Sequence, residues 1–243
     1  MIIVIDYKNI EVMTINTCHV LIIQGEFKMK IKWFGQSCFM ITSENGTKIL
    51  LDPYKNALGY KLPEEIEADL VATSHDHSDH NHISAVKGSF VHINGIGRFL
   101  EQGIEIKGVQ TFHDKVLGAK KGKNTIYNFN IDGINVCHCG DLGHTLDSRL
   151  VKEIGNVDIL LLPVGGGFTI DAVDAVIVMK QLTPTVVIPM HYRTKALGVL
   201  GLAFAKVDKF ISASGLQVRE HTELELNSEN IKDYSGIAVL KYD

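Results

Sequence analysis

Residues 72–82 read ATSHDHSDHNH and place four histidines and two aspartates directly after a run of apolar residues. Within this stretch, His75, His77, Asp79 and His80 form an HxHxDH pattern. When a strand ends just before the pattern, the first two histidines project towards one point and the Asp–His pair reaches a second point beside it. Imidazole and carboxylate ligands suit borderline divalent ions such as zinc, manganese and iron. The pattern therefore predicts a metal site rather than a solvated polar loop, provided that further ligands lie nearby in the fold.

The composition is that of a globular protein without an overall basic surface. The chain has 243 residues, of which 45% are hydrophobic, and a formal net charge of −4. This length is sufficient for a buried core, and the charge disfavours nucleic acid as a partner. The cysteines are sparse and irregularly spaced, which is typical of a reduced intracellular protein. They are Cys18, Cys38, Cys137 and Cys139.

No segment has the sequence character of a membrane span or a signal peptide. No apolar run approaches the roughly 18 residues that a transmembrane helix needs. The N-terminal apolar run contains Asp6 and has no basic leader before it. We therefore expect a cytoplasmic protein with no membrane span.

Short runs rich in β-branched and aromatic residues dominate the first half of the chain and predict strands. They cover residues 29–41, 47–52, 68–74, 88–93, 104–112, 125–131 and 134–140. Later, an apolar run at 157–164, a segment with helical periodicity at 170–182 and another apolar run at 185–191 predict a strand, a helix and a strand. Thr169 is the expected helix cap, and residues 203–214 are a further helix candidate. This order predicts a mixed α/β fold.

The domain organisation predicted from these elements is one domain with a short N-terminal extension. The two strand-rich stretches joined near residues 115–125 suit two similar halves packed together within residues 29–243. Residues 1–28 form an N-terminal extension of uncertain order. An added strand pair and a loosely attached segment are equally compatible with that extension.

Three more candidate ligands follow predicted strands. His113 comes after the run at 104–112, Asp141 after the run at 134–140, and His191 closes the run at 185–191. Ligands at the ends of several strands converge on one edge of a sheet. Distant residues therefore supply the context that the HxHxDH pattern requires.

These ligands and the motifs around them resemble the metallo-β-lactamase fold superfamily over roughly residues 29–243. The resemblance is to the branch of small metal-dependent hydrolases related to L-ascorbate-6-phosphate lactonase. It implies a four-layer αβ/βα sandwich, in which two sheets face each other and helices lie outside. The motifs that carry it are KIKWFGQSCFMI, ILLDPY, HCGDLGH, LLPVGGGFTID and VIPMHY.

The resemblance also implies a division of the ligands between two divalent metal ions. Zinc is favoured, and manganese and iron are alternatives. By this resemblance the first ion is bound by His75, His77 and His113, the second by Asp79, His80 and His191, and Asp141 bridges the two.

Such a pair of ions predicts hydrolysis by a metal-bound hydroxide, with a small-molecule ester or lactone, including phosphorylated ones, as the expected substrate. Asp79 is expected to orient the hydroxide. For His144, proton donation to the leaving group and a structural loop role are equally open. Redox chemistry is disfavoured because the relatives that use it generally have a carboxylate at the position of His77. Phosphodiester hydrolysis, of a phospholipid or a nucleic acid, and non-catalytic metal binding or sensing are the alternatives.

Other residues near these motifs have two interpretations each. Asp52 either supports a ligand histidine or ends its strand. Residues 115–125 contain Lys120, Lys121 and Lys123, which either meet an anionic substrate or form a solvated loop. The glycines at 165–167 either approach an anion or permit a tight turn. Cys137 and Cys139 are expected to be buried packing residues. The oligomeric state stays open, with a homo-oligomer as one outcome.

Overall fold

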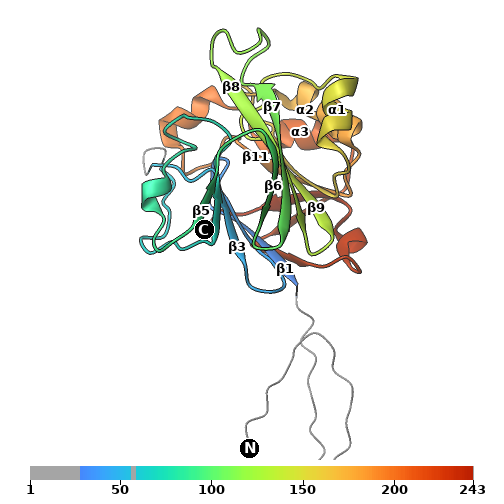
Figure 1. Cartoon of the computed structure of the whole chain (residues 1–243). Helices are drawn as coiled ribbons and strands as arrows, with labels where there is room; N and C mark the ends of the chain where they lie inside the picture. Colours follow the sequence, from blue (N-terminus) through green and yellow to red (C-terminus); the bar gives the residue numbers. More distant parts are fainter. Residues whose placement is uncertain (1–27, 56–58, 243) are drawn as a thin grey trace, which may run out of the picture.

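The computed structural model describes residues 28–55 and 59–242. The N-terminal extension predicted at residues 1–28 lies outside these ranges, except for its last residue. Two β-sheets face each other, and their inner faces enclose the main hydrophobic core (Figure 1). This arrangement confirms the predicted fold class.

The first sheet contains, within the described ranges, six strands in the order β13-β1-β2-β3-β4-β5. They are β1 (Met29–Trp33), β2 (Phe39–Thr42), β3 (Lys48–Leu51), β4 (Leu70–Ala72), β5 (Val91–Ile93) and β13 (Glu223–Leu226). Strand β1 alternates buried and exposed residues because only one of its faces meets the core. Strands β3, β4 and β5 run parallel, so their C-terminal ends lie at one edge.

The second sheet has eight strands among the described residues, in the order β12-β14-β11-β10-β9-β8-β7-β6. They are β6 (Gly97–Glu101), β7 (Ile104–Phe112), β8 (Lys123–Ile131), β9 (Ile134–His138), β10 (Ile159–Pro163), β11 (Val186–Met190), β12 (Val218–His221) and β14 (Gly236–Leu240). Strands β10 and β11 are entirely buried and pair in parallel. The predicted strand–helix–strand unit is therefore present.

The junction between the two sheets differs from the expectation. The chain passes from the first sheet to the second between β5 and β6, not near residues 115–125. Residues 113–122 instead connect β7 to β8, which pair antiparallel within the second sheet. The segment was expected to join two halves because strand-rich stretches lie on both sides of it, whereas it is the long loop of a β-hairpin, at the top of Figure 1.

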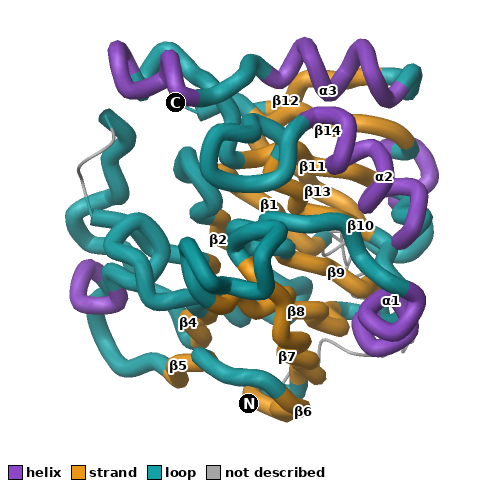
Figure 2. The backbone as a smooth tube through the Cα atoms, turned by 90° about the horizontal axis from the view of Figure 1, so that it is seen from above, coloured by secondary structure: helices purple, strands orange, loops and turns teal. Residues whose placement is uncertain are grey.

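The outer layers of the two sheets are built differently (Figure 2). The α-helices α1 (Ser148–Ile154), α2 (Ala172–Leu182) and α3 (Val207–Ser214) lie on the side of the second sheet. The 3₁₀ helices are η1 (Ile83–Ala85), η2 (Gly198–Ala203) and η3 (Ile231–Tyr234). Loops and η1 cover the first sheet, where a second apolar cluster includes Tyr54, Tyr60 and Val71. In residues 28–55 and 59–242, no helix has the length and apolar character required to cross a lipid bilayer.

The start of α2 corrects the predicted cap. Asp171, not Thr169, is the N-cap, and its side chain accepts hydrogen bonds from the backbone N–H groups of Val173 and Asp174. Thr169 lies two residues earlier, in the turn that leaves the glycines. The candidate helix at 203–214 is also shorter than expected, because α3 begins only at Val207.

We predict that Asp171→Ala lowers the free energy of unfolding by about 1 kcal/mol, since it leaves two helix N–H groups without an acceptor. Thr169→Ala is the matched control, and its effect should stay within about half of that value. Urea unfolding monitored by circular dichroism measures both. Equal losses in the two variants would contradict the assignment of the cap.

Candidate metal centre

All seven predicted ligands come together at one end of the two sheets. His75, His77, Asp79 and His80 lie in the loop after β4. His113 follows β7, Asp141 follows β9, and His191 follows β11. Their side chains form two groups, in each of which the candidate ligand atoms lie within 4.8 Å of one another.

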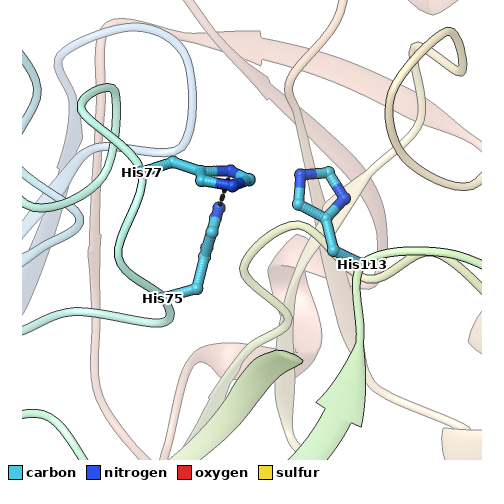
Figure 3. A group of neighbouring side chains, drawn as sticks. All are labelled: His75, His77 and His113. Carbon is cyan, nitrogen blue, oxygen red and sulfur yellow. Dashed lines mark hydrogen bonds between the residues drawn. The ribbon is translucent and has the colours of Figure 1, made fainter. Parts of the chain in front are cut away.

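The first group consists of His75, His77 and His113 (Figure 3). The first two rise from one loop, and His113 faces them from the end of β7. His75 Nε2 and His77 Nδ1 are 2.9 Å apart, and the His113 ring centroid is 5.0 Å from that of His75 and 5.3 Å from that of His77. His113 is buried but His77 is exposed, so this group has an open side.

The second group consists of Asp79, His80, Asp141 and His191. His80 Nε2 lies 3.2 Å from Asp141 Oδ1 and 3.6 Å from Asp79 Oδ2. His191 Nε2 lies 3.4 Å from Asp141 Oδ2. The same Oδ2 is 3.1 Å from His113 Nε2, so Asp141 contacts a member of each group.

These donor sets fit divalent metal ions. Imidazole nitrogens and carboxylate oxygens are the ligands that zinc, manganese and iron use. The Nε2 atom of His80 is buried between the carboxylates of Asp79 and Asp141 and forms no well-aligned hydrogen bond with the described groups, and a bound cation would satisfy it. Burial, together with the nearby positive charge of His80, lowers the pKa of His75 to about 3. His75 is therefore neutral and ready to donate its lone pair.

Asp52 lies behind the second group and is fully buried. Its Oδ2 is 2.8 Å from His80 Nδ1 and 2.8 Å from His138 Nε2. The backbone N–H of Ser74 donates to Asp52 Oδ1, and the Ser74 hydroxyl donates to Oδ2. Burial raises the pKa of Asp52, but the facing charges and hydrogen bonds of His138 and His80 outweigh burial and hold the pKa well below its usual value. The supporting interpretation of Asp52 thus matches its contacts.

His138 belongs to this buried cluster, although the sequence analysis gave it no role. It lies in β9 between the buried free thiols of Cys137 and Cys139. No local signal in the sequence indicated its partner Asp52, which lies 86 residues away in the chain.

Asn124 is a second residue that the sequence analysis missed. This fully buried side chain accepts a hydrogen bond from the backbone N–H of Asp141 and donates to the Cys139 carbonyl. Gly140 precedes the ligand with φ of 53°, and a Cβ there would lie 2.5 Å from Asn124 Oδ1. The turn that presents Asp141 therefore requires glycine.

The contacts of His144 match the structural loop role. Its Nε2 accepts a hydrogen bond from the backbone N–H of Phe112 at 3.2 Å, and its Nδ1 is 2.8 Å from the Thr145 carbonyl oxygen. Both ring nitrogens are therefore engaged with the backbone. We do not assign His144 a proton-transfer step.

The loop between β7 and β8 is organised by Asp114. Its carboxylate accepts hydrogen bonds from four backbone N–H groups, those of Val116, Gly118, Lys120 and Lys121. Lys121 crosses to the glycine-rich turn, where its ammonium donates to the Phe168 carbonyl at 2.6 Å and lies 5.0 Å from the centroid of the Phe168 ring. The loop is thus held from within by Asp114 and against the glycine-rich turn by Lys121.

The turn at residues 165–167 is shaped by close backbone contacts. A Cβ at Gly165 would lie 2.2 Å from the His191 carbonyl oxygen, and the Gly166 N–H is bonded to the Ile170 carbonyl. The first N–H groups of α2 are taken by Asp171. These contacts match the tight-turn interpretation of the three glycines.

Comparison with known proteins agrees with this geometry. Residues 30–191 match the family model described as the beta-lactamase superfamily domain. The chain belongs to the metallo-β-lactamase superfamily. A metal-dependent hydrolase of the UPF0173 family from Pelotomaculum thermopropionicum is 32% identical, with 68% of this chain and 85% of the relative covered. A member of the same family from Thermoplasma acidophilum is 30% identical, with 68% and 84% covered.

Solved structures show the same relationship. A Thermotoga maritima protein assigned as a zinc-dependent hydrolase of the metallo-β-lactamase superfamily is 38% identical, with a TM-score of 0.73, and covers 87% of this chain and 98% of its own. The metallo-hydrolase Igni18 of Ignicoccus hospitalis has the same fold, with a TM-score of 0.62, 23% identity, and 88% and 95% covered. The predicted enzyme class, metal-dependent hydrolase, is thereby confirmed.

We predict that binding of an ion to the second group releases about one proton, and that its affinity rises with pH. Burial lowers the pKa of His80, but the carboxylates of Asp141 and Asp52 outweigh it and raise the pKa well above the usual value. An incoming ion must therefore displace that proton, whereas His75 carries none. Calorimetric zinc titrations in buffers of different ionisation enthalpy count the protons released. Equal heats in all buffers would contradict the prediction.

Proposed function

We propose that this metal-dependent hydrolase uses two divalent ions, held by the seven ligands, to cleave an ester or lactone bond in a small anionic molecule. The observation that carries the proposal is the position of Asp141. Its two oxygens lie within 3.4 Å of His113 in the first group and of His80 and His191 in the second. One carboxylate between two donor groups supports a pair of neighbouring ions rather than two independent sites.

The division of labour follows from the donors and their exposure. When bound, two such ions lower the pKa of a shared water and polarise the substrate oxygen. The Asp79 carboxylate is one-third exposed. It can therefore accept a hydrogen bond from a water molecule at the open side of the centre. No side-chain nucleophile is required. Zinc is the favoured ion, with manganese and iron as alternatives, because nitrogen and oxygen donors accept all three.

The position of Lys121 favours a substrate with a negative charge. This residue lines a hollow of about 570 Å³ together with His75 and His77, so Lys121 borders the open side of the first group. Asp114 holds the backbone of Lys121 in place, and the Phe168 carbonyl holds its ammonium. A phosphate or carboxylate on the substrate would replace a neutral acceptor with a charged one, which strengthens the hydrogen bond. Phosphorylated esters and lactones are therefore the first substrates to test.

The cytoplasmic location remains part of the proposal. Among the described residues, Cys38, Cys137 and Cys139 are free and buried. Free thiols are typical of proteins in reducing compartments.

We predict that His77→Ala lowers kcat/KM on lactone or ester substrates by at least about 100-fold and reduces the metal content, because even groups behind metal ligands typically contribute about 10–100-fold. His82→Ala is the matched control, because His82 lies in the same histidine-rich stretch but in neither donor group. It should retain the wild-type kcat/KM and the wild-type metal content. Elemental analysis and hydrolysis with added zinc or manganese provide the measurements.

Full metal content and full turnover in His77→Ala would refute the site assignment. Turnover of bis(p-nitrophenyl)phosphate without turnover of esters or lactones would favour phosphodiester hydrolysis instead. Tight metal binding without activity on any substrate would favour a binding or sensing module.

We predict that Lys121→Met raises KM for a phosphorylated ester by about 10-fold with little change in kcat, since a hydrogen bond to a charged group contributes about 1.5–3 kcal/mol. KM for the unphosphorylated ester should stay nearly constant. Lys120→Met, which removes an exposed charge from the same loop, is the control for general electrostatics. Steady-state kinetics on the paired substrates measure both effects. An equal rise in KM for both variants would show that Lys121 makes no specific contact.

A further inference from the structure

Gln36 lies in the tight loop between β1 and β2, directly against the second donor group. The loop is closed by backbone hydrogen bonds from Phe34 to Cys38 and from Cys38 to Gly35, both of 2.9 Å. The Gln36 carbonyl accepts from the Trp33 indole N–H at 3.1 Å and from the backbone N–H of His191 at 3.1 Å. The backbone of Gln36 is therefore held by two residues, and one of them, His191, is a candidate metal ligand.

Two features of Gln36 are unfavourable for folding. Its φ angle is 51°, in the left-handed region that a β-carbon makes strained. Its side chain is only 2% exposed, and its Oε1 is buried without a partner among the described groups. A buried, unpaired polar atom costs free energy that an apolar side chain of the same size would avoid. Folding alone therefore does not explain a glutamine at this position.

The hydrogen bond of the side chain indicates what the amide does. Gln36 Nε2 donates to Asp79 Oδ2 across 3.4 Å, and this is the Asp79 oxygen that lies 3.6 Å from His80 Nε2. Asp79 is the most exposed ligand of its group, so it has the greatest freedom to turn away. Gln36 is placed to limit that freedom.

We propose that Gln36 is a positioning residue that holds the Asp79 carboxylate towards the second donor group and thereby sets the affinity of that group for its ion. The inference rests on the proposed function, since it takes Asp79 as a ligand. Gln36 acts in the same way as Asp52, which orients His80 from the end of β3, but it reaches the donor group from the loop after β1. Groups that orient metal ligands typically change metal affinity by about 10–100-fold.

The deciding variant is Gln36→Met, which keeps the volume of the side chain and removes the donor. We expect its zinc affinity at the second group to fall by about 10–100-fold, while the affinity of the first group stays within about two-fold. Competition titrations with a chromophoric chelator measure both constants. Activity should fall at limiting zinc and return when zinc is in excess, which a damaged fold would not do.

Gln102→Met is the matched control. Gln102 has nearly the same left-handed backbone, with φ of 52°, but is exposed in the turn after β6, away from the donor groups. Gln36→Asn is the second variant, because asparagine tolerates a positive φ but is too short to reach Asp79. Gln36→Asn should lower the zinc affinity of the second group as Gln36→Met does. The unfolding midpoint of the metal-free protein should change little in Gln36→Met, Gln36→Asn and Gln102→Met.

The outcomes separate this inference from the proposed function. Two ions bound by the wild type and bound equally tightly by Gln36→Met would overturn the role of Gln36 and leave the proposed function intact. A wild type that binds one ion or none would overturn both. A loss of activity in Gln36→Met that excess zinc does not restore would also overturn the inference, because it would show a role other than metal affinity.

Discussion

The buried carboxylate of Asp141 is the group on which the centre depends. It is 2% exposed, and a carboxylate so far from water is tolerated only next to positive charge. Burial raises its pKa, but the facing histidines, His191 and His80 first, outweigh burial and hold the pKa well below its usual value. In the metal-free protein protonated His80 supplies positive charge, and a bound cation would supply it instead. Metal binding and the stability of this end of the molecule are therefore linked.

The scaffold brings this charge and its partners together through parallel strands. Because β9 and β11 run in the same direction as β10, residues that follow them reach the same edge. Three of the seven described non-glycine residues with positive φ angles, Gln36, Asp52 and His191, lie in or beside the two donor groups. Backbone strain concentrated in this way is typical of functional sites, where surrounding packing holds unfavourable conformations.

The sequence predicted the features of this centre that lie within single segments of the chain. Contacts between distant segments were mostly not predicted. HxHxDH spacing and apolar runs of strand length are visible in single segments, and so are ligands at strand ends. Of the partners behind the ligands, Asp52 was left with two interpretations, whereas His138 and Gln36 were not recognised, because His138 meets Asp52 across 86 residues and Gln36 meets Asp79 across 43. The helix cap was misplaced for a local reason. Both Thr169 and Asp171 can cap a helix, and the preceding glycine turn determines which of them meets the free N–H groups.

The two donor groups differ in how deeply they are buried. This difference assigns the reaction to the buried group and the selection of substrates to the exposed one. His80, Asp141 and His191 are buried. Asp141 and His191 follow strand ends, and His80 is held by Asp52, so their geometry is a property of the fold. His77 is exposed and faces a hollow bordered by the loop between β7 and β8. Four backbone hydrogen bonds to Asp114 shape that loop, so its sequence can vary around one anchor. Selection among substrates would therefore be made at the open side, while the reaction is determined by the buried one.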